Sequence, residues 1–436
     1  MRFTGTLRDR EGKALEMAAP AEVVLPRFEY YSAREKAVLD NTTGFLALDS
    51  VAGTALNLGF FLATTVLSGM LWSLTNFLQL ANFLPAVGLP VPLNVRLLFS
   101  LLAVANVNIE FLEAFLNTAF SASSPGLETR SATSSPALAE LMPSTQLLLN
   151  SAVLLALWLL FFLVYVAVCL VHALTPAASP RKARLRTWQL GCSRSFLLLA
   201  LAESTLELFL ASLHNLAHPS AASLLERLSA ALALVLFVLF LSLPFFLLRV
   251  LSQDPLHLEN PAFTAKYGPL LEPLRRTPSP TAKGSGTGSG SGSGMGVLVL
   301  HYHSLFVARR LLVVVVLYAL PGFPRAQAFL LAGLVLATIV YLSRARPLAD
   351  RTQLCLEIFN EVCLLLIILL LTSLELSLRV LAFSTLVGWV CVAIVCFAIL
   401  VNILSVVPCG AYATIKGWCQ KCRQCRKKKD CQHSRN

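Results

Sequence analysis

The sequence predicts an all-α protein, a polytopic transmembrane helix bundle, from three observations. Apolar runs recur along the chain, and they approach the roughly 20 residues that a helix needs to cross a hydrocarbon core of ~30 Å. Hydrophobic residues make up 56% of the 436 residues and charged residues only 13%, whereas soluble proteins carry roughly 25% charged residues. Basic residues gather in alternate links between the runs, as they do in multi-span membrane proteins.

Nine segments have the length and composition of candidate spans. They are Ser50–Trp72, Leu93–Leu116, Leu147–Leu174, Cys192–His214, Leu228–Val250, Leu305–Leu320, Arg325–Leu342, Leu354–Leu374 and Val380–Val406. The second segment contains two glutamates and an arginine, which are costly in hydrocarbon. We expect it either to cross the membrane or to lie along the interface, so the bundle has nine spans or eight.

The distribution of charge predicts a cytoplasmic C terminus. The link after the third span holds four basic residues and no acid, and the tail from residue 408 holds eight basic residues against Asp430. Short links rich in Lys and Arg stay on the cytoplasmic side. The net charge of +12 is therefore expected to face the anionic inner leaflet, and nucleic acid is not an expected partner.

Composition divides the chain into five parts. Residues 1–45 are hydrophilic, and residues 46–250 form a first block of about five helices with a Ser/Pro-rich outer loop at 119–146. A cytoplasmic linker at 251–303 contains the repeat GSGTGSGSGSG, typical of a flexible connection. Residues 304–407 form a second block of about four helices, and 408–436 form a basic, Cys-rich tail.

Polar residues inside the predicted spans are candidates for function, because their burial in lipid is costly. Glu203 and Glu207 share one face of the fourth span, and Glu357 and Glu361 share one face of the eighth, beside Asn360. These side chains could line a path for cations. They could equally pair with arginines across the bundle, for which the chain offers Arg194, Arg309 and Arg310.

Two further motifs suggest modification. Asn41 begins the sequence Asn-Thr-Thr just before the first span, and it is a glycosylation acceptor if the N terminus lies outside the cell. The charges of residues 1–45 are balanced, so they do not decide on which side of the membrane the N terminus lies. The tail carries a compressed series of thiols. These are Cys419, Cys422, Cys425 and Cys431. Three alternatives stay open for these cysteines: palmitoylation, metal binding, or no special role. No metal site or cofactor is assigned.

The order of several motifs resembles the membrane region of transient-receptor-potential-like (polycystin-related) proteins of protists, algae and fungi. The stretch NPAFTAKYGPLLEPLRR leads through HSLFVARRLLVVVVLYAL to IVYLSRARPLAD and LEIFNEVCLLL, and the resemblance extends over roughly residues 45–405. The positions that carry it are Lys266, Tyr267, Gly268, Arg309, Arg310, Arg346, Pro347, Asn360 and Glu361.

The resemblance implies a cation channel or channel subunit, a homo- or hetero-oligomer, in a plasma or ciliary membrane or, alternatively, an organelle membrane. It also implies a linker that lies on the inner leaflet and contacts lipid. Its residues would be Lys266, Tyr267, Arg275, Arg276, Arg309 and Arg310.

The outer links are too short for a pore helix and filter, so two alternatives remain. One is a non-conducting anchor or scaffold of the same fold, and the other is an unrelated transporter. We expect no enzyme, because the sequence holds no HExxH, GxSxG or P-loop motif.

Overall fold

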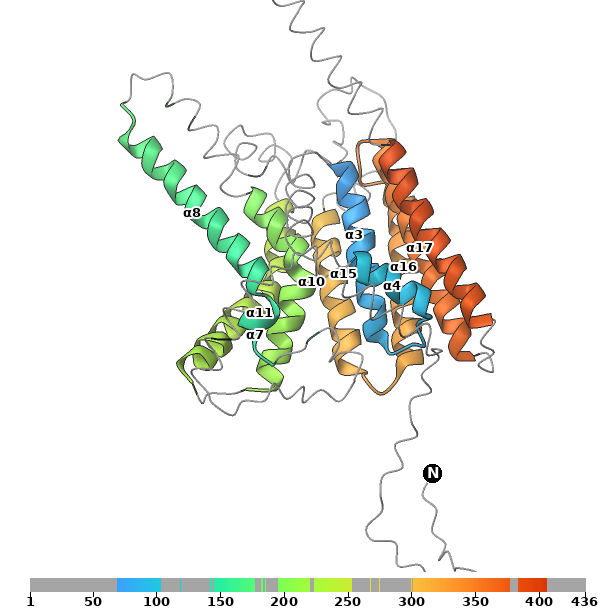
Figure 1. The fold of residues 1–436 in the computed structure, drawn as a ribbon. Coiled ribbons are helices and arrows are strands. Elements are labelled where there is room, and N and C mark those ends of the chain that lie inside the picture. The colour runs from blue at the N-terminus through green and yellow to red at the C-terminus, as the bar shows by residue number, and fades with distance from the viewer. Residues whose placement is uncertain are drawn as a thin grey trace, which may run out of the picture.

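The computed structural model describes residues 69–102, 145–176, 195–219, 223–252, 301–376 and 383–405, together with single residues at 118, 142, 182, 185, 267, 274 and 299. The regular secondary structure of this part is helical (Figure 1), and one isolated β-bridge joins Leu274 to Leu348. The predicted all-α class is confirmed.

Six helices in the described part are long and apolar enough to cross a membrane. They are α8 (Ala152–Leu174), α11 (Leu224–Leu251), α15 (Tyr302–Ala319), α16 (Pro324–Ala345), α17 (Arg351–Leu376) and a last helix at Phe383–Ser405. They overlap six of the nine predicted spans, the third and the fifth to ninth. The chain is therefore an integral multi-pass membrane protein, and a larger number of spans stays a prediction.

The predicted first span ended too early. Helix α3 (Gly69–Phe83) continues eleven positions past Trp72 and is followed by the 3-10 turn η1 (Leu84–Val87). Gly88 ends that turn with φ 72°, a left-handed conformation that glycine adopts without strain, and α4 (Leu93–Leu102) follows. The polar side chains of Asn76 and Asn82 on α3 are buried in the bundle.

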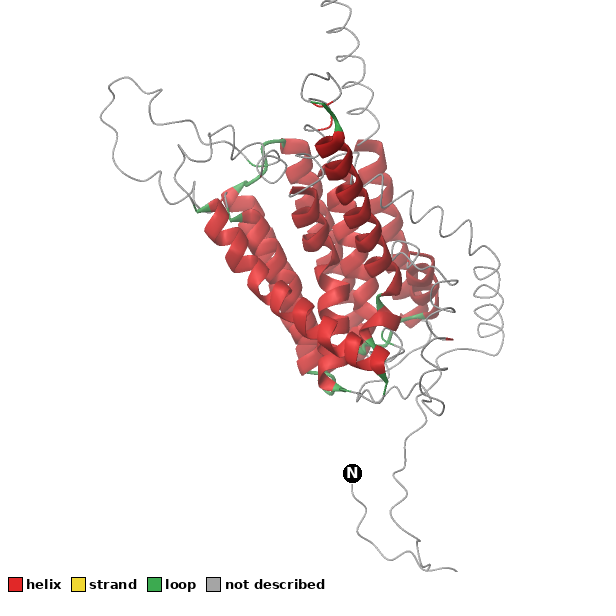
Figure 2. Cartoon of the chain, turned by 90° about the vertical axis from the view of Figure 1, so that its left-hand side faces the viewer, coloured by secondary structure: helices red, strands yellow, loops and turns green. Residues whose placement is uncertain are grey.

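Helix α15 lies at the centre of the bundle. It packs against α10 (Ser195–Ala217) and α11 on one side and against α16 on the other (Figures 1 and 2). Helices α16 and α17 form an antiparallel pair, and α3 packs against α17. The Ser304 hydroxyl of α15 donates to the Pro244 carbonyl of α11 at 2.7 Å. The two blocks predicted from composition are therefore in contact, and one buried apolar cluster extends through both.

Helix α8 makes few contacts within the described part. It follows a short helix, α7 (Leu147–Asn150), after a break at Ser151, and it leans away from the other helices in Figure 1. Most of its large apolar side chains are exposed, including Leu160, Phe162 and Leu170. In a membrane protein such a surface contacts lipid at no hydrophobic cost.

The linker between the blocks is described only in part. Leu274 pairs with Leu348, in the connection between α16 and α17, and joins a small buried cluster with Tyr302, Leu342 and Leu354. Tyr267 packs against the main apolar cluster. These two residues attach the linker to the N-terminal end of α15 and to the α16–α17 connection.

Candidate functional site: a polar cavity between four helices

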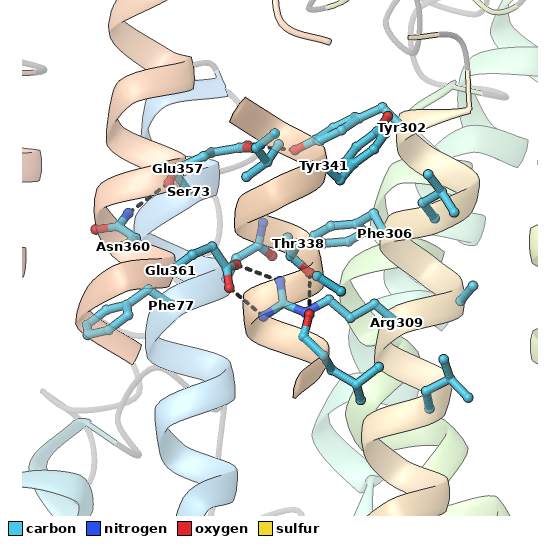
Figure 3. A pocket seen from close by; sticks show the side chains of 17 residues that line it. Ser73, Phe77, Tyr302, Phe306, Arg309, Thr338, Tyr341, Glu357, Asn360 and Glu361 are labelled. Atoms are coloured by element: carbon cyan, nitrogen blue, oxygen red, sulfur yellow. Dashed lines mark hydrogen bonds and ion pairs between the residues drawn. The ribbon is translucent and has the colours of Figure 1, made fainter. Parts of the chain in front are cut away.

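A cavity of about 320 Å³ lies between α3, α15, α16 and α17 (Figure 3). This volume is at the lower end of the range for small-molecule sites, ~300–1,000 Å³. The side chains that carry polar groups into it come from all four helices. They are Ser73, Asn76, Tyr302, Arg309, Thr338, Tyr341, Glu357, Asn360 and Glu361.

Arg309 of α15 and Glu361 of α17 form a bidentate ion pair across the cavity. The Nη1 and Nη2 atoms of Arg309 donate to the two carboxylate oxygens at 2.5 and 2.6 Å. Parallel bonds of this kind fix both direction and distance, which a lysine could not do. The Arg309 Nε–H group is buried and has no acceptor in the described part of the chain.

Glu357 lies one helical turn before Glu361 on the same face of α17, as its spacing predicted. Its carboxylate accepts a hydrogen bond of 2.6 Å from the Tyr302 hydroxyl. Within the described residues no arginine, lysine or histidine forms an ion pair with it. Figure 3 shows Tyr302, Tyr341 and Glu357 together at one end of the cavity, with the Arg309–Glu361 pair at the other.

Asn360 of α17 bonds to α3 and to the last helix. Its amide donates to the Ser73 hydroxyl of α3 at 2.7 Å. Asn360 and Asn402 also exchange hydrogen bonds of 3.2 and 2.8 Å through their side-chain amides, which joins α17 to the last helix. All three side chains are buried. A paired amide satisfies its own polar groups, so this contact holds the helices together without a net charge.

Arg310, the next residue of α15, is directed toward α3 and α10 and is 1% exposed. Its guanidinium donates to the Asn76 and Gln79 side chains of α3 at 2.5 and 2.6 Å, and to the backbone carbonyls of Ala202 and Glu203 in α10. The ring of Phe306 lies 4.5 Å from its Cζ, within cation–π range. Five neighbouring groups on three helices thus surround a single buried charge.

The structure brings together four of the residues singled out from the sequence: Glu357, Asn360, Glu361 and Arg309. Ion pairing was one of the two alternatives for the carboxylates, and Arg309 makes that pair with Glu361. We also expected Arg309 and Arg310 to contact lipid. Arg310 is instead enclosed by protein, because α15 begins at Tyr302 and places both arginines in its second and third turns.

The other candidate glutamates lie on α10, away from the cavity. Glu203 is buried near Arg310, whose charge acts on it, but its Oε1 atom has no hydrogen-bond partner within the described residues. Glu207 is partly buried one turn further along the helix.

Sequence analysis missed several residues that surround the charges, namely Ser73, Asn76, Gln79, Tyr302, Thr338 and Tyr341. A signal did exist: Ser73, Asn76 and Gln79 recur every three residues in an otherwise apolar segment, which places them along one side of a helix.

Several predicted residues lie outside the described part of the chain. They are Asn41, Arg194, Lys266, Arg275, Arg276, Cys419, Cys422, Cys425 and Cys431. Among the residues that are described, no group of three or more His, Cys, Asp or Glu side chains could hold a metal ion.

Comparison of the chain with known protein families, with curated proteins and with solved structures gave no match.

Proposed function

We propose that this integral membrane protein is a cation channel or channel subunit of the transient-receptor-potential-like kind. The observation that carries the proposal is the excess of carboxylate in the cavity between α3, α15, α16 and α17. Two carboxylates, Glu357 and Glu361, face this space, and one guanidinium, that of Arg309, accompanies them. The resemblance in motif order noted above supports the same class of function.

The charges of the cavity favour a cation. Because Arg309 is occupied by Glu361 through both terminal nitrogens, it compensates that carboxylate first. Glu357 has a hydroxyl donor but no ion-pair partner in the described part, which leaves a formal charge of −1 when it is ionised. A charge in the interior of a membrane protein is costly unless it is compensated, and a permeating cation is one means of compensation.

The remaining oxygens suit a cation as well. Ser73 and Thr338 bring hydroxyl oxygens to the same lining as Glu357 and Glu361. Hard cations take oxygen ligands of this kind. In this proposal Glu357 contacts the ion, and the Arg309–Glu361 pair sets the shape and net charge of the site.

A non-conducting anchor is the second candidate, and the bidentate Arg309–Glu361 pair favours it. A pair that is satisfied on both sides needs no ion and fixes α15 to α17. An unrelated transporter would use the same cavity for a solute.

Cation flux into proteoliposomes tests the proposal. We expect flux through the wild-type protein and a loss of about tenfold or more in Glu357→Gln, since a contact with a charged group is worth ~1.5–3 kcal/mol. Glu375→Gln is the matched control. It removes a carboxylate from the same helix, but one whose ion pair with Arg325 is partly exposed and 3.5 Å long.

A double variant, Arg309→Gln with Glu361→Gln, removes the ion pair without leaving either charge alone. If Glu357 contacts the ion, this variant conducts and Glu357→Gln does not. Absence of flux from a monodisperse, correctly inserted wild-type protein would refute conduction and favour the anchor.

A further inference from the structure

We infer that the cavity between α3, α15, α16 and α17 binds a single-chain amphiphile whose head group is an amino alcohol. The inference rests on the proposed cation site, because it assigns the same carboxylate, Glu357, to the ligand's ammonium group. It goes beyond that site by identifying how a ligand enters and what its tail contacts.

The cavity is open on the side between α15 and α16. Of its lining residues, the exposed ones come from these two helices: Leu305 is 44% exposed and Leu312 48% exposed, and Ala337 of α16 is also exposed. The lining residues of α3 and α17 are buried or partly buried. Both α15 and α16 are candidate membrane spans, so this opening faces the lipid rather than either aqueous side.

The open side is apolar and the closed side is polar. The exposed lining residues, Leu305, Leu312 and Ala337, are apolar, while Glu357 is buried and the side chains of Arg309 and Glu361 are only 11% and 12% exposed. A ligand that enters from the membrane therefore passes its head group inward and leaves its alkyl chain against the leucines. This polarity fits an amphiphile that enters from the lipid.

The head group is specified by what the cavity lacks. It lacks a second positive charge to match its two carboxylates, because Arg309 is paired with Glu361 and the hydrogen-bond partner of Glu357 among the described residues is the neutral Tyr302 hydroxyl. An ammonium group would bind this carboxylate beside the Tyr302 hydroxyl, in the part of the cavity that Tyr341 also lines. A phosphate head group would meet two carboxylates and an arginine whose terminal nitrogens are already occupied.

The cavity also lacks a hydrogen-bond acceptor for one of its donors. Arg309 lines the cavity, and its buried Nε–H group has no acceptor in the described part of the chain. A hydroxyl group next to the ammonium supplies that acceptor. Charge and hydrogen bonding therefore point to the same head group.

Calorimetric titration of the protein in phosphatidylcholine nanodiscs tests this assignment, with empty nanodiscs to correct for partition into lipid. The probes are 2-aminododecanol, dodecylamine, dodecane-1,2-diol and dodecanoic acid. We expect the amino alcohol to bind most tightly, the amine next, and the diol and the acid at least about tenfold more weakly. Glu357→Gln should remove this preference for the amines, whereas Glu375→Gln should keep it.

A second pair of variants tests the route of entry without changing a charge. Leu312→Trp narrows the opening and should weaken binding of the amino alcohol, while Leu386→Trp adds the same ring to an exposed site on the last helix that does not line the cavity. Equal binding of the diol and the amino alcohol to the wild-type protein would overturn the inference, as would equal binding to both tryptophan variants. A preference for the amines that Glu357→Gln removes supports the amphiphile site whether or not the protein conducts. The cation flux that tests the channel is measured separately, without the amphiphile.

Discussion

The buried guanidinium of Arg310 gives the sharpest prediction about stability. We expect Arg310→Met to lower the free energy of unfolding by about 2–6 kcal/mol. Methionine fills a similar length of cavity but donates no hydrogen bond. The Ala202 and Glu203 carbonyls lie within a helix and still accept its backbone hydrogen bonds when Arg310 is replaced. The side-chain oxygens of Asn76 and Gln79, in contrast, each lose the donor seen in the structure. An acceptor left without its donor costs ~1–3 kcal/mol, toward the lower end at Gln79, which is half-buried, and more at Asn76, which is buried.

The measurement is equilibrium unfolding in mixed micelles with a denaturing detergent, followed by pulse labelling of thiols. Cys363 and Cys391 are buried and report loss of the fold when they become reactive. Arg325→Met is the control, because that arginine lies in an exposed, 3.5 Å ion pair that should be worth at most about 1 kcal/mol. An equal, small loss in both variants would refute the reasoning, since it would mean that Asn76 and Gln79 are satisfied without Arg310.

Three further variants test contacts away from the cavity. Asn402→Ala removes the reciprocal amide bonds to Asn360 and should cost about 1–3 kcal/mol in the same unfolding assay; a change below the error of the assay would show that the amide pair does not stabilise the last helix. Gly388→Val should displace the Asn94 side chain of α4, because a Cβ atom at Gly388 would lie 2.0 Å from its Oδ1 atom, and the shift should cost the Asn94 bonds to the Thr385 carbonyl and the Val95 N–H; an unchanged thermal midpoint would show that these bonds do not stabilise the contact between α4 and the last helix. Ser223→Ala removes the side-chain N-cap of α11 and should cost about 1 kcal/mol, so a stability equal to wild type would indicate that another group caps the helix.

The helices that hydropathy alone could predict are those whose surfaces face lipid. The spans Leu147–Leu174 and Leu228–Val250 correspond to α8 and α11, with ends that differ by a few residues and a break at Ser151. A long run with few polar residues has few alternatives to a spanning helix in a membrane. Helix α3 was harder to delimit, because its polar residues lower the hydropathy of a segment that protein, rather than lipid, surrounds.

The site was predictable in its parts but not in its pairing. Spacing places Glu357 and Glu361 on one face of α17, and intramembrane carboxylates can be recognised as candidates from the sequence. Their partners depend on which helices are neighbours, and nothing in the local sequence distinguishes Arg309 from Arg310 as the partner of Glu361. Packing decides this, because α15 has α10 and α11 on one side and α16 on the other.

The consecutive arginines of α15 therefore have different roles that follow from helix geometry. Neighbouring residues on an α-helix point about 100° apart. Arg309 is directed toward α17 and pairs with Glu361, while Arg310 is directed toward α3 and α10. A rotation or shift of α15 would have to change both sets of bonds together, since the two side chains share one rigid backbone. If the cavity responds to a cation or an amphiphile at Glu357, α15 is the element through which that response would reach α10 and α11, which do not line the cavity.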